Sequence, residues 1–193
     1  MNEFIEKHLS QEERTILLSL ARQAILEAVA HKRRTQYDVN DLPPSLQHPG
    51  ASFVTLTKNG NLRGCIGTLE PYQSLAADVC EHAIAAALQD FRFPPVKQEE
   101  IKDINIEISR LTIPVELNYS LPDELLKKIT PHVDGVIIND GVHRATFLPQ
   151  VWEKIPDGAT FLGNLCQKMG AASDLWRRKK LQVLVYQVEE FHE

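Results

Sequence analysis

Apolar residues recur at helical spacing in four stretches of the chain. A capping box formed by Ser10 and Glu13 marks the start of the first stretch. The second stretch, about residues 73–89, has an apolar face made mostly of small residues, which suits close packing against a sheet. The fourth stretch, about residues 160–170, contains Cys166, which we expect in the core, and ends at Gly170. The pattern therefore predicts helices over about residues 11–30, 73–89, 122–129 and 160–170.

Period-two alternation predicts strands in most of the remaining chain. An Asn59-Gly60 pair between two β-rich runs is a strong hairpin signal. If these two residues form the loop, Val54 pairs with Cys65 and Leu56 pairs with Arg63, which makes the Cys65 face partly apolar. A second hairpin is expected around residues 139–141. The predicted strands cover about residues 51–58, 61–68, 104–109, 135–138, 143–148 and 181–188.

The second strand of the first hairpin carries the most informative chemistry. Along a regular strand Arg63, Cys65 and Gly67 share one face, and a guanidinium beside a sulfur favours the thiolate. Gly64 and Gly67 weaken a strand and pack no side chain. Their presence indicates that another backbone or a ligand approaches closely here.

Two loops also stand out. Residues 35–50 contain three prolines and no sustained period, which predicts a long surface connection. Residues 90–95 end in two prolines, so Asp90 and Arg92 should sit on a stiff loop beside Phe91 and Phe93.

Length and charge limit the classes of function. The chain has 193 residues and a formal net charge of −5, which suits one compact unit or two small subdomains and gives no general attraction to nucleic acid. The basic run Arg177–Lys180 is a solvated turn or, less favoured, part of an RNA-binding face. No signal-like or membrane-spanning apolar run is present, so we expect a cytoplasmic protein that uses no membrane.

The metal-binding and redox residues form no recognisable pattern. Three cysteines, widely separated, predict reduced thiols and neither a disulfide framework nor a structural zinc site. The seven histidines show no metal-ligand spacing. The sequence therefore supports no metal and no cofactor.

Five separate motifs of the chain occur in a characteristic order: Leu62–Thr68, Asp90–Val96, Ile106–Ser109, Thr146–Trp152 and Leu165–Gly170. Together they resemble the AMMECR1 family in its prokaryotic form, often called AmmeMemoRadiSam system protein A. The resemblance covers roughly residues 15–191. The second hairpin departs from the family pattern Gly-x-His-Gly, so no role is carried over to His132.

This resemblance implies an α+β fold, in which helices pack on an antiparallel sheet and a smaller subdomain leaves a cleft. The first part would cover about residues 10–112 plus the C-terminal strand, and the smaller part about 113–180. The resemblance also implies radical SAM and Memo-like partner proteins and a small anionic or oxygenated metabolite. This chain has no C-x-x-x-C-x-x-C run, so radical SAM chemistry would belong to a partner.

One hypothesis is an enzyme. Cys65 would be a nucleophilic or redox thiol, Arg63 would lower its pKa or bind an anion, and His82 or His143 would transfer protons. Alternatively, Cys65 is a small buried residue and Arg63 a structural ion pair with Asp90 or Glu107. The expected ligand-binding residues are Arg63, Gly64, Gly67, Asp90, Arg92 and Arg144.

The second hypothesis is a binding module. The same cleft would hold a small ligand or a segment of a partner enzyme, and this chain would make no bonds itself. RNA or DNA binding is a third and weaker reading, because no aromatic-basic strand motif is present and the balance of charge is acidic.

Overall fold

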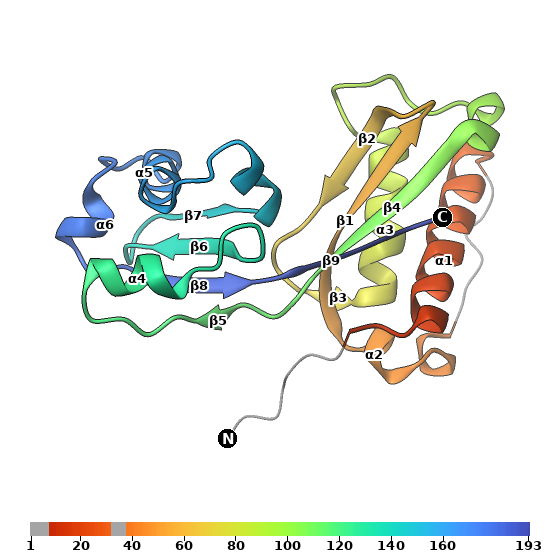
Figure 1. The fold of residues 1–193 in the computed structure, drawn as a ribbon. Helices are drawn as coiled ribbons and strands as arrows, with labels where there is room; N and C mark the ends of the chain where they lie inside the picture. The colour runs from red at the N-terminus through yellow and green to blue at the C-terminus, as the bar shows by residue number, and fades with distance from the viewer. Residues whose placement is uncertain (1–7, 32–37) are drawn as a thin grey trace. The chain divides into compact units, whose positions relative to one another are not determined.

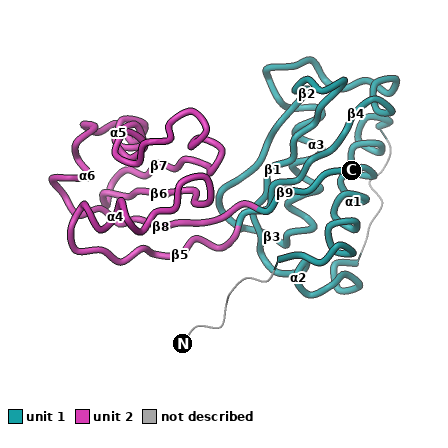
Figure 2. Tube along the Cα trace, in the orientation of Figure 1, with its two compact units in different colours: residues 1–111, 189–193 teal, residues 112–188 magenta. Residues whose placement is uncertain are grey.

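The computed structural model describes residues 8–31 and 38–193, and these form two compact units (Figure 2). Unit 1 contains the described residues up to Leu111 together with Glu189–Glu193, and unit 2 contains Thr112–Val188. Each unit has its own hydrophobic core. Each combines antiparallel sheet with helices, so the predicted α+β class is confirmed.

Unit 1 is an antiparallel sheet in the order β2-β1-β4-β9, and β3 extends it by pairing with β1. Two long helices, α1 and α3, pack on this sheet (Figure 1). Its core joins residues of both helices to Val54, Leu56, Ile106 and Ile108 of the sheet. The bounds are α1 Gln11–Val29, β1 Pro49–Lys58, β2 Asn61–Gly67, β3 Gln73–Ser74, α3 Leu75–Leu88, η2 Gln98–Asp103, β4 Ile104–Leu111 and β9 Val188–His192.

Local sequence signals define both long helices. The Ser10 hydroxyl accepts a hydrogen bond from the backbone N–H of Glu13, and the Glu13 carboxylate accepts one from the backbone N–H of Ser10, as the capping box predicts. Ser74 caps α3 in the same way through the N–H of Ala77. The small residues of α3 let it lie close to β1 and β2, as expected.

The predicted hairpin forms, but its predicted register is wrong beyond Leu62. Lys58 pairs with Asn61 around the Asn59-Gly60 turn, and Thr57 pairs with Leu62. A β-bulge then shifts the register, so Thr55 faces Cys65. The Cys65 face is consequently more polar than predicted.

Residues 38–50 contain more structure than the predicted surface connection. They form η1 Val39–Asp41 and α2 Pro44–Gln47, and β1 begins at Pro49. Leu46 is completely buried in the core of unit 1, which explains why this segment is ordered around it. Residues 35–37 of the predicted connection lie outside the described part of the chain.

Unit 2 is a four-stranded antiparallel sheet in the order β5-β8-β6-β7. Its core contains Trp152, which stacks on Phe161 with ring centroids 3.6 Å apart, and the buried Trp176 and Cys166. The bounds are β5 Val115–Glu116, α4 Pro122–Lys128, β6 Gly135–Asn139, β7 Arg144–Phe147, η3 Pro149–Glu153, α5 Gly158–Lys168, α6 Leu175–Arg178 and β8 Gln182–Tyr186.

The end of the chain forms two strands where one was predicted over 181–188. β8 lies in the middle of the unit 2 sheet, between β5 and β6. β9 pairs with β4 in unit 1. The chain therefore passes from unit 2 back to unit 1 near Val188.

Candidate functional site

The bulge in β2 separates the two groups that the sequence predicted side by side. Arg63 has no partner in the β1 register, and its guanidinium binds Glu100 of η2 through Nε at 3.2 Å and Nη2 at 3.0 Å. Lys58 Nζ lies 3.0 Å from the same carboxylate. Hydrogen bonds from Arg63, helped by Lys97 N–H and Lys58, lower the pKa of Glu100 to about 2. The fork of Arg63 is thus occupied by an internal carboxylate, and its partner is neither Asp90 nor Glu107.

Cys65 occupies a different environment. Its sulfur accepts a hydrogen bond from the Thr55 hydroxyl at 3.2 Å, and the residue is only partly buried. Cys80 and Cys166 are buried, and burial raises the pKa of the Cys166 thiol. Cys65 is therefore the most accessible of the three thiols.

Asp90 and Arg92 close the outer edge of β2 at Cys65. Asp90 Oδ2 accepts from the backbone N–H of Cys65 at 2.9 Å, and Arg92 Nη2 donates to the carbonyl of Cys65 at 3.1 Å. The two side chains also bind each other, with Nε to Oδ1 at 2.8 Å and Nη2 to Oδ2 at 2.6 Å. The Arg92 guanidinium and the two backbone N–H groups hold the pKa of the buried Asp90 carboxyl well below its usual range. The structure thus brings Asp90 and Arg92 to the backbone of Cys65, and the Arg92 guanidinium also interacts with the Cys65 side chain.

This clamp fixes one end of the loop over residues 90–96. The N–H of Val96 donates to the carbonyl of Ala87 at 2.8 Å and anchors the other end. Between the two anchors Phe91 is 95% exposed. A large apolar ring is therefore held out into solvent by a loop with fixed ends.

The glycines of β2 are required by close packing within unit 1. A Cβ added to Gly64 would lie 2.1 Å from the carbonyl oxygen of Ala86 in α3. At Gly67 it would lie 2.4 Å from both the Phe53 ring and the carbonyl oxygen of Ser52. The close approach that the glycines indicated is made at both positions by the protein itself.

The two predicted proton-transfer histidines lie in different units. His82 is buried on α3, and its Nδ1 lies 3.2 Å from Asp78 Oδ2, which also accepts from the Ser52 hydroxyl at 2.6 Å. His143 is exposed in the β6–β7 turn of unit 2, with Nδ1 3.6 Å from Asp140. His82 therefore serves a buried polar cluster between α3 and β1, and the proton-transfer roles stay predictions.

Arg144 also belongs to unit 2. It begins β7 and pairs in register with Asn139. The sheet leaves its side chain exposed. Its assignment to a ligand stays a prediction.

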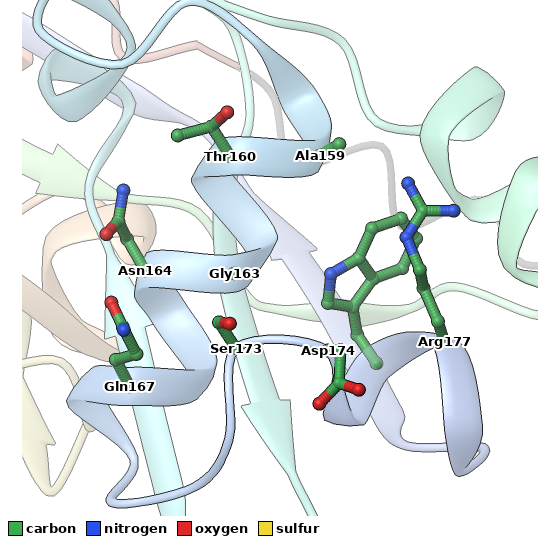
Figure 3. Close-up of a pocket in the computed structure, with 9 residues that line it drawn as sticks. Ala159, Thr160, Gly163, Asn164, Gln167, Ser173, Asp174 and Arg177 are labelled. Carbon is green, nitrogen blue, oxygen red and sulfur yellow. The ribbon is translucent and has the colours of Figure 1, made fainter.

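Sequence reasoning missed a groove in unit 2, between α5 and the segment that leads into α6 (Figure 3). Its volume is about 390 Å³. One wall consists of Thr160, Asn164 and Gln167, which recur at helical spacing on α5. That polar stripe on an otherwise apolar helix was the available signal. The remaining lining residues are Ala159, Gly163, Ser173, Asp174, Trp176 and Arg177.

Within residues 8–31 and 38–193, no group of three or more His, Cys, Asp or Glu side chains could hold a metal ion. Within the same residues, no helix combines the length and apolar character needed to cross a bilayer.

Comparison with known proteins adds the following similarities. The AMMECR1 family model matches residues 18–191. A protein from Methanothermobacter thermautotrophicus is 40% identical over 190 residues, which cover 96% of each chain. A protein from Methanococcus aeolicus is 42% identical over 160 residues, covering 81% of this chain and 80% of the relative. The crystal structure of an uncharacterised protein from Pyrococcus horikoshii is similar, with a TM-score of 0.79, 34% identity and coverage of 96% of this chain and 93% of that one.

Proposed function

This chain belongs to the AMMECR1 family, and we propose that it is a binding module that docks a partner protein on the loop over residues 90–96 of unit 1. One observation carries the proposal: Phe91 is 95% exposed on a loop clamped by Asp90 and Arg92. An exposed aromatic ring has an unfavourable contact with water that a partner can remove.

The clamp makes this ring suitable for recognition. Binding costs free energy when loops and side chains must be ordered, and a loop fixed beforehand avoids much of that cost. Aromatic residues and arginines are also the residues that most often dominate protein interfaces. Arg92 and the prolines Pro94 and Pro95 lie exposed around Phe91. The expected partner surface is an apolar pocket that accepts the Phe91 ring.

The candidate partners follow from the family resemblance. We propose a radical SAM protein or a Memo-like protein, acting together with this chain on a small metabolite in the cytoplasm. In this scheme the partner carries out the chemistry. The clamp at the edge of β2 is consistent with such a role, because it leaves the charged groups of the loop already paired.

The test is direct binding between purified proteins. The radical SAM and Memo-like proteins of the same host would each be titrated into this chain by isothermal calorimetry. Phe91→Ala should weaken binding at least ten-fold, or about 1.4 kcal/mol, and should leave the melting temperature nearly unchanged because the ring touches little of the protein.

Val142→Ala is the matched control, since Val142 is an apolar residue that is 83% exposed on a loop of unit 2. It should bind like the unaltered chain. Absence of binding to both proteins, or an equal loss in Phe91→Ala and Val142→Ala, would refute docking on this loop.

Thiol chemistry at Cys65 is a second candidate, favoured by one contact. The Thr55 hydroxyl donates a hydrogen bond to the Cys65 sulfur at 3.2 Å. Arg63, bound to Glu100, is a structural ion pair in this arrangement. The groups placed to act on the Cys65 sulfur would therefore be Thr55 and Arg92, and not Arg63.

Labelling by iodoacetamide near neutral pH tests this candidate. Cys65 should react faster than Cys80 and Cys166, and Thr55→Val should slow its reaction while Arg63→Gln should not. Slow and equal labelling of all three thiols would rule out a reactive Cys65.

A further inference from the structure

The groove of unit 2 is lined by polar side chains that are not hydrogen-bonded within the described part of the protein. Asn164, Gln167 and Ser173 line it, and within the described residues their side chains form no hydrogen bond. Each can donate and accept. Asn164 is partly buried, so its amide has lost part of its contact with water without gaining a partner.

Arg177 adds a positively charged group with free donors. Its guanidinium lies over the ring of Trp176, with Cζ 4.1 Å from the ring centroid. Among the described residues, no hydrogen bond or salt bridge engages this guanidinium. Trp176 is almost fully buried, so the stacking holds Arg177 against a fixed surface.

The carboxylates near Arg177 are already engaged. Asp174 binds Arg178 through Oδ1 at 2.8 Å. Asp157 accepts from the backbone N–H of Thr160 at 2.8 Å and from its hydroxyl at 2.6 Å. The Arg177 charge helps to lower the pKa of Asp157, but among the described residues no salt bridge joins them, so the donors of Arg177 remain available to an external anion.

The groove also has a defined floor. Gly163 of α5 faces the chain around Ser173, and a Cβ there would lie 3.3 Å from the carbonyl oxygen of Ser173. Figure 3 shows α5 on one side, with Ser173, Asp174 and Arg177 on the other. A volume of about 390 Å³ suits a small metabolite and is too small for a folded partner.

From these observations we propose that the α5–α6 groove binds a small polar metabolite through a carboxylate or phosphate group. Arg177 binds the anionic group with two parallel hydrogen bonds. Asn164, Gln167 and Ser173 bind the polar remainder. This site lies wholly within unit 2 and is independent of partner docking on unit 1.

The test is an NMR titration of the ¹⁵N-labelled full chain with two separate probes, succinate and inorganic phosphate, at constant ionic strength. We expect saturable shifts of the Arg177 Nε–H and of the side-chain amides of Asn164 and Gln167. Response to succinate alone identifies a carboxylate site, and response to phosphate alone identifies a phosphate site. Either supports the proposal.

Arg177→Gln should lower the affinity for the probe that binds by at least ten-fold. Arg177→Lys should recover only part of the affinity, since an ammonium keeps the charge and loses the fork. Lys127→Gln is the charge-matched control, because Lys127 is an exposed cation on α4 that does not line the groove. It should bind both probes unchanged.

Two results would overturn the proposal. One is the absence of saturable shifts at Arg177, Asn164 and Gln167 with either probe. The other is equal weakening by Arg177→Gln and Lys127→Gln, which would indicate a general effect of net charge. Melting curves of each variant exclude unfolding as the cause of a loss.

Discussion

Arg63 of unit 1 and Arg177 of unit 2 show how differently two arginines of one chain can be used. Arg63 stands two positions from a cysteine in a glycine-rich strand, yet Glu100 takes up its Nε and Nη2, and its Nη1 is buried without a hydrogen-bond partner among the described residues. Arg177 stands in a plain basic run, yet it lines a groove and stacks on Trp176 without an ion pair among the described residues. An arginine can bind a ligand only with donors that the protein has left over, and the neighbours in sequence do not reveal this.

The glycines of the same two regions differ in a parallel way. Gly64 is packed so tightly against α3 that a methyl group would overlap the Ala86 carbonyl. Gly163 leaves space for a methyl group at the cost of a small shift of its neighbour. The β2 region is therefore built for packing, whereas the α5–α6 groove keeps open volume.

Gly64→Ala should cause the largest loss of stability among these variants. The Ala86 carbonyl is part of a helix backbone and cannot move aside alone, so β2 and α3 must separate, and we expect a loss of about 3 kcal/mol in unfolding free energy. Urea denaturation followed by circular dichroism at 222 nm measures it, because α1 and α3 supply much of the helical signal. A loss no larger than that of Gly163→Ala would contradict the packing argument.

Asp90→Ala should cause the next largest loss of unfolding free energy. The change leaves the Cys65 N–H and the Arg92 guanidinium without their acceptor, and we expect about 2–3 kcal/mol of destabilisation. Asp90→Asn keeps an oxygen for one donor and should cost less. The same denaturation series measures both variants, and equal stability of the two would show that the carboxylate charge contributes nothing to the clamp.

Acid should weaken unit 1 through Glu100. The pKa of Glu100 is lowered to about 2 in the folded state from an ordinary value of 4.5, so its stabilising contribution is complete above the ordinary value and is lost as the pH falls toward 2. The difference in unfolding free energy between the unaltered chain and Glu100→Gln should therefore shrink over this range. A difference that stays constant with pH would mean that Arg63 and Lys58 do not stabilise the ionised carboxylate.

Gly163→Ala should give the smallest effect on stability, under about 1 kcal/mol, because a contact at 3.3 Å needs only a small adjustment. Both tryptophans of the chain lie in unit 2, so their fluorescence during denaturation reports on this unit.

The methyl group added in Gly163→Ala should nevertheless reduce the affinity of the groove for succinate or phosphate. Unchanged binding would place the ligand away from Gly163.

Local signals in the sequence were enough to predict α1, α3, α4, α5 and most strands, but not the short helices α2 and α6. The predicted cap Ser10 lies where α1 begins, and the Asn59-Gly60 pair forms the turn between β1 and β2. Glycines in β2 correctly indicated a close approach. These features depend on residues near one another in the chain, so they can be read without the fold.

The sequence by itself determined the family, the α+β class and the motif residues that meet at the edge of β2. Only the tertiary structure decided that a bulge turns Arg63 to Glu100 and that Arg177 forms no salt bridge in the part of the chain described. The physical reason is that a side chain's chemistry depends on which of its donors and acceptors remain unpaired after folding. The groups that pair can lie far apart in the sequence, as Arg63 and Glu100 do at a separation of 37 positions.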